Sequence, residues 1–229
     1  MSNKSTGSNG RAPSATERGD ATRERLLDAL ESIAADEGLA ALSHRAIARR
    51  ASLHTGLIHY HFGTVDRLLD EAIARRAQRF AASQLAALSA LFARGRWTVE
   101  DVVAALWQPF AALGRAIEQG WRNYLCLVAR LAGDGGRDQL LARHFRDVAA
   151  AARDALRAAL PAATDDALSA GLRFIRTLFE QETLARCRMK SAPGRQLGND
   201  QQLTRFAAAG LRGLAGESPA RAPSRVAAD

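Results

Sequence analysis

Three of the chain's five histidines lie within twelve residues, in the stretch SLHTGLIHYHFG from Ser52 to Gly63. Imidazoles can bind a metal ion, act as a catalytic base or hydrogen-bond another molecule. On a helix, His59 and His61 lie about 200° apart around the axis and cannot share one ion. The stretch holds no Cys, Asp or Glu to complete a coordination shell, and Ser52 is its only candidate nucleophile partner. We therefore expect neither a metal site nor a catalytic site here.

The same stretch has the pattern of a short helix with two different faces. Ile58 and Phe62 are four residues apart and should enter a small core, with His61 half-buried beside them. The other side presents a glycine, an apolar side chain and two hydrogen-bonding aromatics: Gly56, Leu57, His59 and Tyr60. Such a surface suits a DNA groove, where an apolar group can meet a thymine methyl. The alternative, aromatic core filling, explains Phe62 but not the residues pointing away from it.

The elements around this stretch predict an all-α protein of about nine helices. Alanine and leucine dominate a hydrophobic content of 47%, and no run alternates with period two. The first helix is expected to be capped by Asp20 or Thr22 and to end before Gly38, and Ser43 is expected to cap a second helix over 45–50. The third helix is expected to end at Tyr60, and Thr64 to cap the fourth. Further helices are expected from 98 with a kink at Pro109, and over 121–132, 137–160, 164–188 and 200–214. Two short helices joined by a turn at 51–53 indicate a helix-turn-helix.

Composition and charge predict the domain boundaries and the cellular compartment of the protein. We expect a disordered arm over 1–19, the helix-turn-helix domain over 20–66, a second domain over 67–215 and a disordered tail over 216–229. The net charge of +8 suits a polyanionic partner, and residues 38–65 contain no acid. Cys126 and Cys187 lack a C-x-x-C spacing, which argues against a disulfide framework or a zinc module. No run is long enough for a membrane span, so the chain is expected to be cytoplasmic.

The region covering about residues 20–70 resembles the N-terminal domain of TetR-type transcriptional repressors. The pairs Ile47-Ala48, His61-Phe62 and Leu68-Leu69 fall in register together within it. The resemblance implies a two-domain all-α homodimer, with an N-terminal helix-turn-helix and a C-terminal domain for a small ligand and dimerisation. No cofactor is expected. Carried over by position, it implies a DNA-contact set of Ser43, His44, Arg45, His54, Thr55, Gly56, Leu57, His59, Tyr60 and Thr64.

Four positions depart from the pattern of that family. Ser52 stands where the turn usually has glycine, His54 where a serine caps the recognition helix, His59 where tyrosine is frequent, and Val65 where lysine is common. The missing lysine removes one phosphate anchor. Arg67, or the basic arm with Lys4, Arg11 and Arg18, is the expected substitute.

The second half suggests a ligand site and a dimer face. Aromatic side chains and the polar side chains of one short helix give the candidate ligand set Trp107, Phe110, Trp121, Asn123, Tyr124, Leu127, Arg130 and Phe174. A buried Arg130 without an acid would favour an anionic ligand. Two apolar stripes give the candidate dimer interface, Leu168, Leu172, Ile175, Phe179, Leu203, Ala207, Gly210 and Leu214, with packing inside one protomer as the alternative.

The sequence thus predicts a sequence-specific DNA-binding regulator, a repressor released from a palindromic operator by a small-molecule effector. A transcriptional activator or a ligand-independent regulator of the same fold is the first alternative. A nonspecific nucleoid protein is a more distant alternative. A helical enzyme using Cys187 or His144 is another, and it is disfavoured because no sequence motif pairs those two side chains.

Overall fold

The structure is a computed structural model that describes residues 14–115, 119–134, 138–188 and 199–216. Across these ranges it contains no strand, nine α-helices and one short 3-10 helix. The helices are α1 (Ala15–Asp36), η1 (Leu39–Ala41), α2 (His44–Ala51), α3 (Gly56–Phe62), α4 (Val65–Arg94), α5 (Val99–Arg115), α6 (Gln119–Ala132), α7 (Asp138–Ala159), α8 (Asp165–Arg188) and α9 (Asp200–Leu214). The all-α prediction is therefore confirmed, and α5 continues past Pro109 as one helix.

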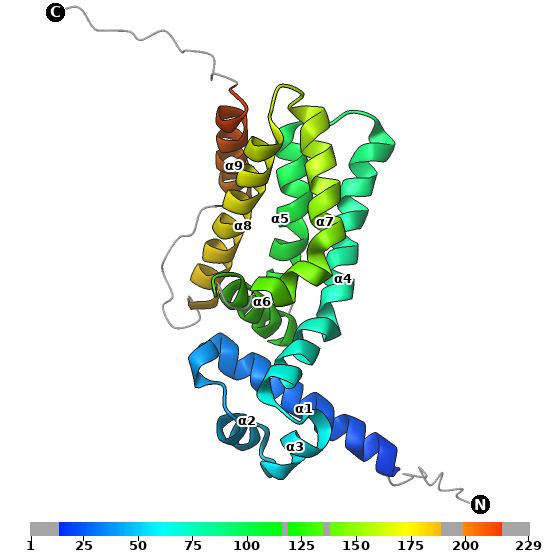
Figure 1. Cartoon of the computed structure of the whole chain (residues 1–229), viewed down its shortest axis with the longest axis vertical. Helices are drawn as coiled ribbons and strands as arrows, with labels where there is room; N and C mark the ends of the chain where they lie inside the picture. Colours follow the sequence, from blue (N-terminus) through cyan, green and yellow to red (C-terminus); the bar gives the residue numbers. More distant parts are fainter. Residues whose placement is uncertain (1–13, 116–118, 135–137, 189–198, 217–229) are drawn as a thin grey trace, which may run out of the picture.

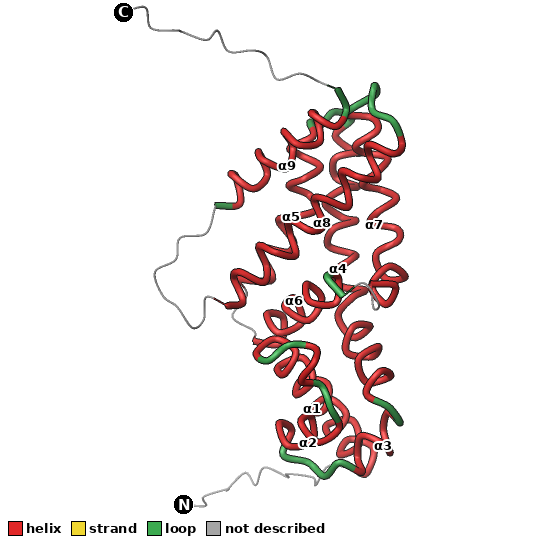
Figure 2. The backbone as a smooth tube through the Cα atoms, turned by 60° about the vertical axis from the view of Figure 1, so that its left-hand side comes forward, coloured by secondary structure: helices red, strands yellow, loops and turns green. Residues whose placement is uncertain are grey.

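The helices form a small group at one end of the molecule and a larger bundle at the other (Figure 1). The small group is α1, α2 and α3, and the bundle contains α5, α7, α8, α9 and most of α4. The short helix α6 lies between them and packs against both α1 and α8 (Figure 2). No described helix combines the length and the apolar composition that crossing a bilayer would need.

The core of the small group extends beyond the expected domain boundary at residue 66. It includes α4 side chains as far as Phe80 and α6 side chains such as Tyr124 and Leu127. A second core fills the bundle and contains Trp107 and Phe179. The core that supports α2 and α3 thus includes side chains of α6, which packs against α1 and α4.

The start of the first helix was predicted wrongly. Ser14 is its N-cap, and the hydroxyl of Ser14 accepts a hydrogen bond from the Glu17 N–H while the Glu17 carboxylate accepts one from the Ser14 N–H. Asp20 and Thr22 lie inside the helix, so residues 15–19 are helical and not part of a disordered arm. Residues 1–13 of that arm and residues 217–229 of the expected tail lie outside the described ranges.

The other predicted ends of the first four helices agree more closely with the structure. Gly38 follows α1 with a φ of 97°, and Ser43 and Thr64 cap α2 and α4 through their hydroxyls. The third helix ends two residues later than predicted, at Phe62, before Gly63 with a φ of 76°. Glycine adopts these positive φ values without the clash of a β-carbon.

Among the residues that the structure describes, Ser52 is the one non-glycine residue with a positive φ, 54°, and it lies in the turn between α2 and α3. Because the left-handed region costs an L-residue about 1–2 kcal/mol, Ser52→Gly should raise the free energy of unfolding by up to about 1 kcal/mol after the added chain entropy of glycine is deducted. Urea denaturation measures this. Ser52→Ala keeps the β-carbon and is the control; an equal gain in both variants would contradict the explanation.

The two cysteines, expected to stand apart, are joined. Cys126 of α6 and Cys187 of α8 form a disulfide with a Cα–Cα distance of 6.3 Å. The expectation failed because it rested on local spacing, whereas packing of α6 across α8 brings together residues separated by 61 positions.

Candidate nucleic-acid interface and internal cavity

The helix α3 has the two faces that its sequence predicts. Ile58 and Phe62 are buried in the core, and the guanidinium of Arg23 lies 4.7 Å from the centre of the Phe62 ring. Tyr60 points the other way and is 82% exposed. Its ring contacts the ring of His61 edge to face at 4.9 Å, and most of its surface is open to solvent. The side of α3 that carries Tyr60 is therefore free to contact another molecule.

The N-terminus of α3 is organised by His54. Its Nδ1 accepts a hydrogen bond of 3.2 Å from the Gly56 N–H, while Thr55 at the N-cap position makes no side-chain cap. The start of α3 thus differs from the usual serine cap, as the histidine at position 54 predicted. At the other end, His59 Nδ1 donates to the Gly63 carbonyl at 3.0 Å, which fixes the ring of His59 in place.

The predicted DNA-contact residues do not all reach the surface. Ser43, Arg45, His54, Gly56, His59, Tyr60 and Thr64 are exposed, while His44, Thr55 and Leu57 are half-buried. The ring of His44 stacks on the ring of His59 with 4.4 Å between their centres, so His44 helps to hold the ring of His59 in position. The hydroxyls of Ser43 and Thr64 already accept helix-cap hydrogen bonds from the N–H groups of Ala46 and Arg67.

Arg49 is a surface cation that the sequence reading left out of the contact set. It lies four residues after Arg45 on α2, and both side chains are exposed. Arg50 differs, because it forms ion pairs with Asp36 at 3.0 Å and Glu37 at 2.6 Å. The i, i+4 spacing of Arg45 and Arg49 was the signal that could have found this pair.

A buried charged group joins α1 to α4. Glu31 is fully buried, with Arg75 at 2.7 Å and Arg76 at 3.6 Å. Burial raises the pKa of Glu31 to about 7 against the opposing charge of Arg75. On α6, the hydroxyl of Tyr124 is buried beside this group, and burial and the charge of Glu31 raise the Tyr124 pKa further above its ordinary value.

Two further side chains of α6, Trp121 and Arg130, contact the same junction. Trp121 lies under the guanidinium groups of Arg76 and Arg79, each 5.3 Å from its ring centre. Arg130 donates a hydrogen bond of 3.1 Å to the Ala35 carbonyl near the end of α1. α6 thus contacts α1 and α4 together and fixes their relative position.

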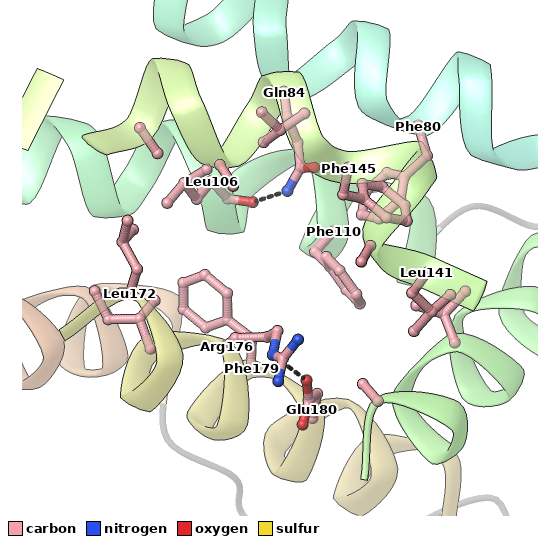
Figure 3. A pocket seen from close by; sticks show the side chains of 17 residues that line it. Phe80, Gln84, Leu106, Phe110, Leu141, Phe145, Leu172, Arg176, Phe179 and Glu180 are labelled. Atoms are coloured by element: carbon pink, nitrogen blue, oxygen red, sulfur yellow. Dashed lines mark hydrogen bonds and ion pairs between the residues drawn. The ribbon is translucent and has the colours of Figure 1, made fainter. Parts of the chain in front are cut away.

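A cavity of about 190 Å³, which we call the main cavity, lies in the bundle and is drawn in Figure 3. Four aromatic rings line it: Phe80, Phe110, Phe145 and Phe179. Phe80 packs edge to face against Phe110 at 4.7 Å and against Phe145 at 5.6 Å. The side-chain amide of Gln84 donates to the Leu106 carbonyl at 2.9 Å, which satisfies that donor within the wall.

Glu180 brings a carboxylate to this wall. The residue is 6% exposed, and its Oε1 lies 3.2 Å from Nε of Arg176 but without the alignment of a hydrogen bond. Burial raises the pKa of Glu180, and the charge of Arg176 opposes the rise. Arg176 itself is half exposed, so its compensation of the buried carboxylate is weak. Glu180 is therefore a buried acceptor that a ligand could satisfy.

The structure does not bring the predicted ligand set together. Within that set, Phe110 alone lines the main cavity, and Trp107 joins Phe110 in a second cavity of about 180 Å³. Trp121, Tyr124, Leu127 and Arg130 belong to the junction with α1 and α4 or its core, Asn123 lies off the cavity wall, and Phe174 is exposed on the outer face of α8. Arg130 thus offers no basis for an anionic ligand, because its guanidinium serves the α1 carbonyl.

The expected dimer stripes also point inward for the most part. Leu168, Ile175, Phe179, Leu203 and Ala207 are buried in the protomer's own core and Leu172 is half-buried, while Gly210 and Leu214 are exposed. The adjacent face of α8 and α9 carries exposed Phe174 and Phe206 and forms an apolar groove of about 330 Å³ with Leu214. We call this the α8–α9 groove.

Comparison with known families gives these observations a common explanation. Residues 26–77 match the family described as bacterial regulatory proteins of the tetR family. Residues 104–210 match the family described as the tetracyclin repressor-like C-terminal domain, so the two matches together cover more than half of the chain. The chain belongs to the TetR family. The TetR match spans α2, α3 and their supports, and the resemblance seen in the sequence is thereby confirmed.

Solved structures share this TetR fold. The multidrug binding protein EbrR, in complex with malachite green, is 21% identical, with 84% of this chain and 96% of EbrR covered and a TM-score of 0.51. A protein of Mesorhizobium loti assigned to the TetR-family transcriptional regulators is 15% identical, with 87% and 97% covered and a TM-score of 0.50. No curated protein matches the chain.

Proposed function

We propose that this TetR-family regulator is a cytoplasmic repressor that binds a palindromic DNA operator as a homodimer. The observation that carries the proposal is the exposed side of α3, where Tyr60 is 82% exposed while Phe62, two residues later, is buried. Base contacts are assigned to His54, Thr55, Gly56, Leu57, His59 and Tyr60, and phosphate contacts to Ser43, Arg45 and Thr64, with His44 placing His59. Arg49 and Arg67 add to the phosphate contacts. No catalytic role is proposed.

Selection of bound sequences from a random duplex library at near-physiological salt tests this function. Two half-sites about one helical turn apart are expected from a two-fold dimer. Enrichment of no sequence would favour nonspecific DNA binding, and binding only in the presence of an added ligand would favour an activator.

Tyr60→Ala should weaken binding to the selected operator by about 10-fold or more, since one good base contact contributes about 1–3 kcal/mol. Binding to unrelated duplexes should change little, because phosphate contacts dominate there. Fluorescence anisotropy with both duplexes measures the two affinities. Arg67→Ala is the matched comparison and should weaken both duplexes alike; equal losses for Tyr60→Ala would place Tyr60 outside base recognition.

The dimer is assigned to the α8–α9 groove. A second copy of the same groove can bury Phe174, Phe206 and Leu214, and Gly210 permits close approach of the two α9 helices. The pairing of identical apolar faces would explain why three large hydrophobic side chains are exposed on neighbouring helices.

The effector is assigned to the cavity lined by four phenylalanines. Aromatic faces attract cations, and Glu180 places a buried carboxylate in the same wall, whose ionised form a bound cation would favour. These features favour a small lipophilic organic cation. The binding of malachite green by EbrR, named in its structure, is compatible with a ligand inside this fold.

Benzyltrimethylammonium should bind to this cavity more tightly than neopentylbenzene, its uncharged isostere. Glu180→Gln should lower the affinity for the cation by about 10-fold, since the loss of one partly desolvated charge interaction is on the order of 1.4 kcal/mol. Isothermal titration calorimetry measures both. Glu182→Gln, on the same helix but off the cavity wall, is the control, and an equal loss there would argue against a direct role of Glu180.

A further inference from the structure

The disulfide joins two of the helices that line the main cavity. Val128 and Ala132 of α6 and Phe179 and Glu180 of α8 line that cavity, and Cys126 and Cys187 connect the same two helices. On its other side, α6 holds α1 through Arg130 and the buried Tyr124. The covalent link therefore lies one helix away from the DNA-contacting helices.

One end of the disulfide can be reached from outside the core. Cys126 is buried, whereas Cys187 is half-buried and lines the second cavity with Arg122 and Arg186. Arg186 forms ion pairs with Glu182 at 3.2 Å and with Asp200 at 2.9 Å, and Arg122 adds a further positive charge to the cavity wall. Positive charge beside a sulfur stabilises an approaching or departing thiolate. The cavity thus offers a route for a small anionic thiol to the sulfur of Cys187.

A disulfide is unusual in the compartment where a regulator meets DNA. Small thiols keep most protein cysteines reduced in the cytoplasm, and the disulfides that do form there are mostly redox-responsive. We propose that the Cys126–Cys187 pair is a thiol–disulfide exchange site for low-molecular-weight thiols of the glutathione class, and that its closure strengthens operator binding. The proposal rests on the proposed function, because it requires a regulator that acts in that compartment.

The exchange proceeds in two balanced steps. A small thiolate attacks Sγ of Cys187, the Cys126–Cys187 bond breaks, and Cys126 leaves as a thiolate that takes up a proton. A second small thiolate attacks the small-molecule sulfur of the mixed disulfide and releases Cys187 as a thiolate. Two electrons pass from the two small thiols, which leave as one disulfide, and the reverse reaction closes the bond.

Closure acts on DNA binding through α6. With the bond closed, α6 is fixed against α8 and holds α1, so α2 and α3 keep one orientation. With the bond open, the contact of α6 with α8 depends on noncovalent packing alone, and the DNA-contacting helices sample more orientations. A less preorganised surface binds more weakly.

The test uses the full chain, which contains two cysteines in total, so no other thiol interferes. The protein is equilibrated across a series of reduced-to-oxidised glutathione ratios. Thiol alkylation with mass spectrometry measures the fraction of closed bond, and hydrogen exchange measures the protection of α6. Anisotropy with the selected operator measures affinity, and hydrogen peroxide replaces oxidised glutathione in a parallel arm to separate exchange from peroxide oxidation.

We expect reversible opening within the glutathione ratios of cells, at least about 10-fold faster exchange of α6 amides when open, and about 5-fold weaker operator binding. The double variant Cys126→Ala with Cys187→Ala should match the open form at every ratio. A bond that never opens under these ratios, or equal operator affinity in both states, would overturn the proposal. Failure to bind any duplex in either state would instead refute the proposed function, while closure by peroxide alone would refute the assigned reagent.

Discussion

Phe206→Arg is expected to convert the dimer into a monomer and to weaken operator binding by about 100-fold or more. Phe206 is 71% exposed in one protomer and lies with Phe174 and Leu214 along the α8–α9 groove. In a two-fold interface the new guanidinium appears twice, and each copy would have to lose water against an apolar surface without an acid in the groove lining. Each half-site would then bind alone and lose the gain from a linked pair.

Sedimentation velocity gives the oligomeric state of the Phe206→Arg variant, and anisotropy gives its operator affinity. Ser89→Arg adds the same charge at an exposed position of α4 outside the groove and should leave both unchanged. A variant that remains dimeric with normal affinity would show that another face of the molecule forms the dimer.

Phe62→Ala should lower the free energy of unfolding by about 3–5 kcal/mol. Phe62 is 1% exposed, and its ring fills the core beneath α3 while it supports the guanidinium of Arg23. Removing the ring leaves a cavity that seven helical residues cannot close by repacking. Urea denaturation followed by circular dichroism measures the loss.

Tyr60→Ala is the matched control for Phe62→Ala, because the two aromatics lie on opposite sides of one helix. With 82% of its surface exposed, Tyr60 should contribute little to stability, and its replacement should stay within about 0.5 kcal/mol of the parent. The two variants thus separate a residue that holds α3 from one available for a partner. Equal losses of stability would contradict the two-faced arrangement of α3.

The local features of α3 and its neighbours could be predicted because they depend on short spacings. The four-residue separation of Ile58 and Phe62 fixed their shared face, and the hydroxyls of Ser43 and Thr64 were recognisable caps. The missed cap at Ser14 was also local, since glutamate follows it three residues later in the pattern of a capping box.

The features that could not be predicted depend on which face of a helix meets which partner. In the sequence, Arg130 is a polar residue on an otherwise apolar helix. Its hydrogen bond to the Ala35 carbonyl could not be predicted, because it requires α6 to lie against α1. α8 carries two apolar faces, and periodicity alone could not tell that Phe179 enters the protomer core while Phe174 stays outside. The Cys126–Cys187 pair follows from the same packing.

The long helix α4 connects the main cavity to the proposed DNA-contacting surface. Gln84 at the cavity wall is twenty residues from the Thr64 cap beside α3, about 30 Å along the helix axis at about 1.5 Å per residue. A tilt of about 5° at the cavity end would displace the α3 end by roughly 2.6 Å. In a symmetric pair the two displacements add to roughly 5 Å, measured against half-sites about 34–36 Å apart. In the proposed dimer, a ligand that rotates α4 by so little would move the two α3 helices away from the spacing of successive major grooves.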